Sequence, residues 1–175
     1  MNRNFVIAFL GSILFLFIVI CLSVYSYNSN REISFQVFPE LVVSDLFSGS
    51  VNLKDHATDV PSVLIYFNSS CPICQSEAEL IERSFREDTI TRFLWVSSEP
   101  VEEVKNFAIK YRLYRINRHR FYSDSLFRLA ASFKLTGVPA TFVYNGEGHL
   151  VDYTLGAVSM SDLTLSIQKA YVHSR

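Results

Sequence analysis

The sequence contains few of the residues that mark several special classes of protein. Its 175 residues include three cysteines, six glycines, five prolines and one tryptophan, and the formal net charge is −1. Three cysteines are too few for a small disulfide-rich domain, and so little glycine and proline excludes a collagen-like or low-complexity chain. Because the charge is balanced, there is no overall positive field, and the composition predicts no nucleic-acid partner.

One long apolar run is present near the N-terminus. Residues 5–24 contain no charged side chain, and a helix of about 20 apolar residues crosses the roughly 30 Å hydrocarbon core of a membrane. The run is longer than the roughly 7–15 apolar residues of a signal peptide, and no small-residue cleavage site follows it. We therefore expect a retained transmembrane anchor over residues 1–27, with a cleaved signal peptide as the alternative.

The rest of the chain has the composition of an ordinary globular domain. Without the N-terminal run, the apolar share falls from 49% to about 45%, close to the average for soluble proteins. After a polar linker at 28–36, residues 37–175 are long enough for one compact domain. Arg3 precedes the run, and the inside-positive bias favours a cytoplasmic N-terminus with the domain on the outer side.

Strand and helix patterns alternate along the domain. The continuous apolar run at 63–67 is typical of a central strand that is covered on both faces. The other expected strands are 33–38, a hairpin over 42–53, 90–96 and a hairpin over 141–153, and the expected helices are 72–87, 100–111, 126–133 and 160–172. This order predicts an α/β fold with a mixed central sheet, in which helices join parallel strands and one edge is antiparallel.

Two of the cysteines form a Cys-x-x-Cys motif. Cys71-Pro72-Ile73-Cys74 lies where the strand at 63–67 is followed by a helix. The N-terminus of that helix stabilises a thiolate at Cys71, and Cys74, one turn further on, can close a reversible disulfide with it. The spacing predicts thiol–disulfide exchange, in which Cys71 attacks and Cys74 resolves the mixed disulfide.

The same two sulfurs also raise the question of metal binding. A structural zinc site needs four ligands, and the chain has neither a second cysteine pair nor a His-x₃₋₅-His spacing, so we expect no zinc and no other cofactor. Two thiolates suffice for Cu(I), and a copper-handling module is therefore the alternative function. A purely structural disulfide is disfavoured because a four-residue loop removes little chain entropy.

A second motif accompanies the cysteine pair. The string from Val63 to Cys74, together with Gly137-Val138-Pro139-Ala140-Thr141-Phe142 further along, resembles the thioredoxin superfamily. More closely, it resembles the membrane-anchored TlpA/ResA-like thiol-disulfide oxidoreductases of bacteria. The resemblance covers roughly residues 38–173 and implies a thioredoxin-like fold.

The resemblance implies roles for residues outside the cysteine pair. It implies that Pro139 is cis, that its loop packs beside the Cys71 sulfur, and that the backbone of Val138 pairs with the substrate. It also places Pro72 and Ile73 at the substrate-binding surface. Without the resemblance, Val138-Pro139 is an ordinary turn before a strand.

Glu77 is the acidic residue nearest to the motif. TlpA/ResA-like proteins often carry a glutamate at this position, and a half-buried carboxylate there could accept the Cys74 proton if its pKa were raised. The alternative is a solvated helix glutamate like Glu79. Two positions depart from thioredoxin itself, since Ile65 replaces its buried aspartate and Ser70 its tryptophan.

The family also implies partners and a location. The expected substrates are protein disulfides, which the protein reduces, and the expected electron donor is a membrane protein of the DsbD or CcdA type. Cytochrome c maturation is one use of this reaction. The domain is expected on the periplasmic side of the bacterial inner membrane. A peroxiredoxin would have threonine three residues before its cysteine, where this chain has Asn68. The basic, aromatic-rich stretch at 110–120 is expected to be the solvated end of a helix and the edge of a strand, and contact with an anionic partner, with lipid headgroups or with RNA is the alternative.

Overall fold

The computed structural model describes residues 3–33, 35–57 and 59–172. The outer ends of the predicted anchor (1–2) and of the predicted domain (173–175) lie outside the described residues. The chain divides into two compact units, Met1–Ser34 and Phe35–Arg175.

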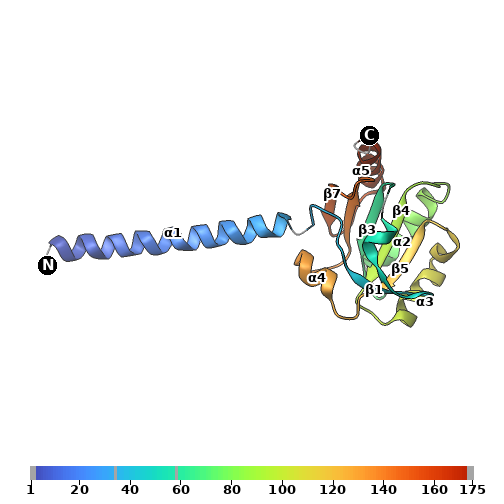
Figure 1. The fold of residues 1–175 in the computed structure, drawn as a ribbon, viewed down its shortest axis with the longest axis horizontal. Coiled ribbons are helices and arrows are strands. Elements are labelled where there is room, and N and C mark those ends of the chain that lie inside the picture. Colours follow the sequence, from blue (N-terminus) through green and yellow to red (C-terminus); the bar gives the residue numbers. More distant parts are fainter. Residues whose placement is uncertain (1–2, 34, 58, 173–175) are drawn as a thin grey trace. The chain divides into compact units, whose positions relative to one another are not determined.

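The described part of the first unit is one helix, α1 (Arg3–Ile33), the long blue helix of Figure 1. Its segment Phe9–Ser26 is long and apolar enough to cross a membrane, and none of that segment is buried. The helix continues through Asn28 to Ile33, so most of the segment predicted as a linker is helical.

The second unit is built on a seven-stranded mixed sheet with the strand order β2-β1-β5-β4-β3-β6-β7. The strands are β1 (Val42–Asp45), β2 (Gly49–Asn52), β3 (Ser62–Tyr66), β4 (Arg92–Ser97), β5 (His119–Ser123), β6 (Ala140–Tyr144) and β7 (Leu150–Leu155). The three central strands β3, β4 and β5 are parallel, and the pairs on either side of them are antiparallel. The predicted mixed sheet is confirmed.

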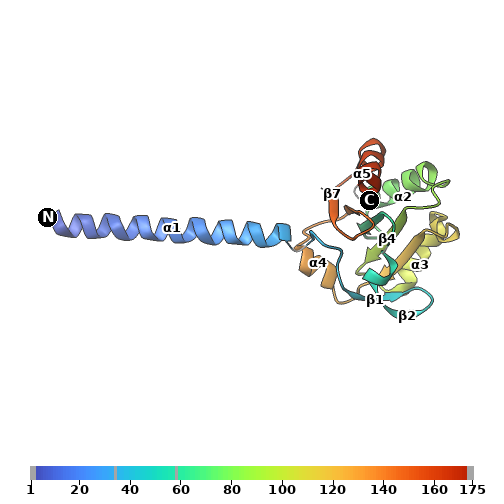
Figure 2. The same ribbon diagram turned by 45° about the horizontal axis from the view of Figure 1, so that its top comes forward.

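Helices cover both faces of this sheet (Figures 1 and 2). They are α2 (Pro72–Ser84), α3 (Val101–Lys110), α4 (Arg128–Phe133) and α5 (Met160–Val172), with 3₁₀ turns η1 (Leu53–His56) and η2 (Leu113–Arg115). One hydrophobic cluster packs α2, α3 and α5 against the sheet, and a second packs α4, η1 and the segment around Phe35 and Phe38. All five residues of β3 are buried, as expected for a strand between two such layers.

Two elements differ from the expectations. The strand predicted at 33–38 is wrong: α1 runs to Ile33, and among the described residues 35–38 only Val37 forms an isolated bridge, with His149. Conversely, β5 begins at His119, at the end of the stretch 110–120, where only the edge of a strand was expected. It is an interior strand, because it pairs with β1 on one side and with β4 on the other. Phe121 and Tyr122 are buried on its two faces, while basic side chains remain near its beginning.

Candidate active site

Cys71 is held at the start of α2, directly after the loop that follows β3. It is the N-cap residue, with extended backbone angles, and Pro72 is the first residue of the helix. The N–H of Cys74 donates to the Cys71 sulfur at 3.4 Å, so the sulfur lies among the unpaired amides of the helix N-terminus. The side chain of Cys71 is half-buried, which leaves its sulfur open to a partner molecule.

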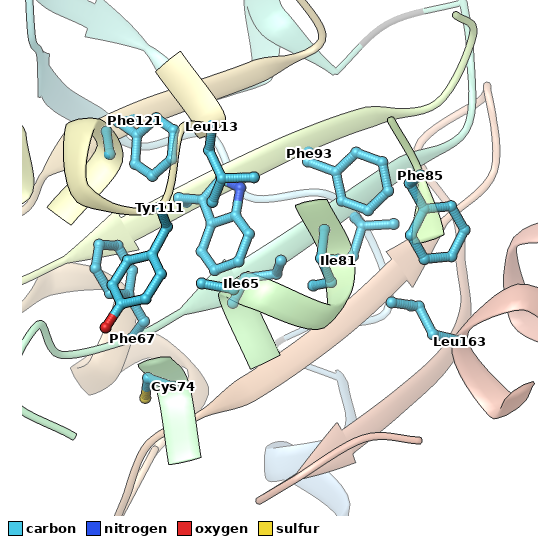
Figure 3. Packing of buried hydrophobic residues seen from close by; sticks show 14 of the residues in the cluster. Ile65, Phe67, Cys74, Ile81, Phe85, Phe93, Tyr111, Leu113, Phe121 and Leu163 are labelled. Carbon is cyan, nitrogen blue, oxygen red and sulfur yellow. The ribbon is translucent and has the colours of Figure 1, made fainter. Parts of the chain in front are cut away.

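Cys74 lies beneath the surface as part of the hydrophobic core. It is 1% exposed, and Figure 3 shows it among the buried side chains of the first cluster. Burial raises the pKa of its thiol to about 12; the backbone of Asn68 lowers that pKa, and Cys71 and Glu77 raise it further. Both cysteines are free thiols here, so this is the reduced pair, and Cys74 needs a base before it can attack.

The loop before β6 lies against the Cys71 sulfur. The Val138-Pro139 peptide bond is cis, as the resemblance implies, and Pro139 is buried. The Cys71 sulfur donates to the carbonyl oxygen of Val138 at 3.9 Å. The two motifs of the sequence therefore meet in space.

Glu77 is a buried carboxylate and not a solvated one. It is 4% exposed, whereas Glu79 on the same helix is exposed. The Thr141 hydroxyl donates to its Oε1 at 3.0 Å, and within the described residues its Oε2 has no hydrogen-bond partner. Burial raises the pKa of Glu77 to about 7, opposed by the hydrogen bond from Thr141. This carboxyl group can therefore exchange a proton near neutral pH.

Thr141 is a site residue that the sequence did not indicate. It lies on β6 two residues after Pro139 and is paired with Ile65 of β3, the position where thioredoxin has its buried aspartate. In this chain the buried acid is Glu77 of α2, and it contacts the sheet at Thr141 of β6, the strand next to Ile65. The available signal was a polar residue inside the otherwise apolar segment Ala140–Tyr144.

Glu99, in the loop after β4, fixes the loop that carries Cys71. Its carboxylate accepts the backbone N–H of Ser69 at 2.7 Å and the Ser69 hydroxyl at 2.6 Å, and it also accepts the Ser97 hydroxyl at 2.8 Å. The side-chain amide of Gln75 donates to the Ser69 carbonyl oxygen at 2.8 Å. β3 and β4 are parallel neighbours, so both loops emerge at the same end of the sheet, a placement that the sequence does not specify.

Two shallow hollows lie beside the thiol site. One, of about 290 Å³, is lined by Pro72, Ile73, Ser76, Glu77, Leu80, Ala157 and Val158. The other, of about 220 Å³, is lined by Thr136, Gly137, Val138, Pro139, Leu155 and Gly156. The four residues predicted to bind substrate thus line surface hollows, and Ile73 is 49% exposed. Within the described residues, no group of three or more His, Cys, Asp and Glu side chains is arranged to bind a metal ion.

No family model matches the sequence, and no curated protein matches it. Solved structures do match. DsbF of Mycobacterium tuberculosis is 21% identical, with a TM-score of 0.65, over 77% of this chain and 99% of that chain. A secreted disulfide oxidoreductase of the same organism, homologous to E. coli DsbE, is 18% identical, with a TM-score of 0.63, over 74% and 96%. A peroxiredoxin-like protein from Aquifex aeolicus is 17% identical, with a TM-score of 0.64, over 78% and 86%. These likenesses show that the chain has a thioredoxin-like fold.

Proposed function

We propose that this thioredoxin-like domain is a thiol-disulfide oxidoreductase that reduces disulfide bonds in protein substrates. One observation carries the proposal: the half-buried Cys71 sulfur lies at a helix N-terminus and beside the Val138-Pro139 loop, with Cys74 and Glu77 buried behind it. This arrangement offers one accessible nucleophile and one protected resolving thiol. The similarity to disulfide oxidoreductases related to DsbE supports the same reaction.

In the first step the Cys71 thiolate attacks one sulfur of the substrate disulfide. The substrate S–S bond breaks, a Cys71–substrate disulfide forms, and the other substrate sulfur leaves as a thiolate. The backbone of Val138 and the exposed surface of Pro72 and Ile73 are the parts of the chain that would contact the substrate on either side of this bond.

In the second step Cys74 attacks the Cys71 sulfur. Glu77 accepts the Cys74 proton, the Cys71–Cys74 disulfide forms, and the second substrate sulfur leaves as a thiolate, so two electrons pass to the substrate. Two of the influences that raise the pKa of Cys74 come from Cys71. They disappear once Cys71 is bound in a mixed disulfide, which makes the proton easier to remove at the moment when it must leave.

The cycle requires a reductant that restores the dithiol. We propose a membrane electron donor of the DsbD or CcdA type, with cytochrome c maturation as one use of the reducing equivalents. We further propose that residues 1–27 anchor the chain and that the domain lies on the periplasmic side of a bacterial inner membrane. The apolar segment Phe9–Ser26 supports an anchor by its length and composition.

Trapping of the mixed disulfide tests the exchange mechanism. In Cys74→Ser the second step is blocked, so a covalent complex between Cys71 and its substrate is expected to accumulate in cells and to disappear on reduction. Cys71→Ser is the matched control and should trap nothing. If the two variants behave alike, Cys71 is not the attacking thiol and the proposal fails.

The reduction potential of the Cys71/Cys74 couple tests the direction of electron flow. A value near that of thioredoxin, about −270 mV, indicates a reductant, and one near that of DsbA, about −120 mV, indicates an oxidant. Stoichiometric Cu(I) binding by the reduced chain without disulfide reductase activity would instead support the copper-handling alternative. Peroxide reduction is not expected, because Asn68 stands where a peroxiredoxin has threonine and its side chain accepts the Ser70 N–H.

A further inference from the structure

Three arginine side chains converge on a pocket at the end of the sheet opposite to the thiols. Cys71 follows the carboxyl end of β3, whereas Arg92 begins β4, Arg118 directly precedes β5 and Arg120 is the second residue of β5. Since these strands are parallel, their amino ends lie together at the end of the sheet opposite to Cys71. The pocket has a volume of about 470 Å³ and is lined by Asp55, His56, Arg92, Asn117, Arg118 and Arg120.

Strand geometry brings two of the three guanidinium groups to one face. Arg120 is paired with Leu94, which belongs to the second hydrophobic cluster. Arg92 lies two residues before Leu94, so it and Arg120 have the parity of that face, and Arg118, directly before β5, completes the lining. η1 supplies His56, whose backbone carbonyl oxygen accepts a hydrogen bond from the Arg92 guanidinium at 3.0 Å.

The positive charge of this pocket is only partly neutralised within the protein. Arg92 and Arg118 are half-buried, yet among the residues the structure describes none of the three arginines forms an ion pair with a carboxylate. Asp55 contributes one negative charge to the lining, and Asp45 acts electrostatically on Arg120 from outside it, so the three guanidinium groups leave an excess of one positive charge. An anion bound in the pocket would balance that charge and contact the half-buried guanidinium groups.

We propose that this arginine pocket binds a phosphate group, carried either by a small soluble phosphate or by a phospholipid headgroup. Planar guanidinium groups match the oxygens of a phosphate through paired N–H donors, and arginine is favoured where phosphate is recognised. The site is remote from Cys71 and does not depend on the proposed thiol chemistry.

Isothermal titration calorimetry on the full chain in a non-ionic detergent tests the proposal with two water-soluble probes. Pyrophosphate represents a soluble phosphate, and glycerophosphoglycerol represents the headgroup of an anionic phospholipid. We expect at least one probe to bind with a Kd below about 1 mM. Arg118→Gln and Arg120→Gln should each weaken that binding about tenfold, because each removes charge-assisted hydrogen bonds.

Arg128→Gln is the matched control, since Arg128 is an exposed arginine of α4 outside the pocket. It should leave the Kd unchanged, and circular dichroism should show that all three variants keep the fold. Tighter binding of pyrophosphate assigns a soluble phosphate, and tighter binding of glycerophosphoglycerol assigns a lipid headgroup. Absence of binding by both probes below about 1 mM, or an equal loss in Arg128→Gln, overturns the proposal.

Discussion

Burial sets the protonation of Cys74 and Glu77, the two groups behind the reactive sulfur. The pKa of Cys74 is raised to about 12 and that of Glu77 to about 7, in both cases chiefly by burial. At neutral pH the resting thiol is therefore protonated, while the carboxyl group is divided between its two forms. A base that is only partly ionised at rest links the resolving step to pH.

The raised pKa of Glu77 predicts a stability effect with a definite sign. Its pKa in the folded state lies above the ordinary value of 4.5, so its contribution to stability is complete below that value and is lost as the pH rises through about 7. In Glu77→Gln the side chain cannot ionise, so this loss of stability with rising pH does not occur. Relative to the unmutated chain, the variant should gain about 2–3 kcal/mol in unfolding free energy between pH 5 and pH 8.

Urea unfolding of the full chain in detergent at the two pH values measures this gain. Glu79→Gln is the control, because Glu79 is exposed on the same helix, and its difference from the unmutated chain should not change with pH. A pH-independent difference for Glu77→Gln would contradict a raised pKa.

Thr141 is expected to position Glu77 and to lower the pKa of its carboxyl group. Its hydroxyl donates to Oε1, and this contact favours the ionised form. Thr141→Val removes the donor with little change of volume, which should raise the pKa of Glu77. The pH at which mixed-disulfide resolution is half-maximal should therefore rise by about one pH unit.

Single-turnover kinetics with a model disulfide between pH 5 and pH 9 measures that midpoint. Thr141→Ser keeps a hydroxyl and should restore the profile of the unmutated chain. An unchanged midpoint in Thr141→Val, with only a uniform decrease in rate, would show that Thr141 contributes packing and does not affect the pKa of Glu77.

The sequence predicts the site residues that lie close together along the chain. Cys71, Cys74 and Glu77 follow one another at helical spacing, so their common position at the start of α2 follows from local geometry. Thr141 and Glu99 reach the site through the strand order β4-β3-β6. A single sequence does not specify that order, and both contacts were missed.

At the scale of elements, burial again decides which helices and strands can be predicted from the sequence. The stretch at 110–120 appears basic and solvated, yet His119 is buried, accepts a hydrogen bond from the Trp95 indole at 3.0 Å, and stacks on Phe93. Burial lowers the pKa of His119 to about 3, so this histidine is neutral. Counting His119 with the arginines concealed an interior strand, whereas β3 was predicted because its apolar run is uninterrupted.

The loop between β3 and α2 depends on Glu99 for its conformation. Two of the hydrogen bonds that end on that carboxylate come from Ser69 of the loop, and a third, from Ser97, holds the carboxylate in place, so Glu99→Ala should increase local opening of residues 68–70. Loss of even one charge-assisted hydrogen bond corresponds to about tenfold faster amide exchange. Hydrogen exchange measured by mass spectrometry on peptides that cover Cys71 tests this expectation.

Glu102→Ala is the control for the loop, since Glu102 is an exposed acid in the first turn of α3. It should leave exchange at residues 68–70 unchanged. Equal exchange in the two variants would show that Glu99 does not hold the loop.

At the scale of the whole molecule, the chain joins an apolar helix to a domain with an ordinary core. The sequence predicted that division from the uncharged run alone, and the structure has its first compact unit end at Ser34. Phe35 is 4% exposed in the second hydrophobic cluster, so the core begins two residues before the predicted domain. One aromatic residue after a polar segment gives no periodic signal, which explains the difference.

A retained anchor predicts both where the chain fractionates and on which side of the membrane its domain lies. With an epitope before Met1 and a reporter after Arg175 that is active only outside the cytoplasm, both ends should remain with the membrane after an alkaline wash, and the reporter should be active.

Leu16→Arg places a charge near the middle of the apolar segment, where insertion is disfavoured by about 2.5–3.5 kcal/mol, and it should lower the membrane-bound fraction. Leu155→Arg, an equivalent change at an exposed position of the domain, should not. A soluble, shortened chain that has lost the epitope would instead identify residues 5–24 as a cleaved signal sequence, and a membrane-bound but inactive reporter would place the thiol pair in the cytoplasm.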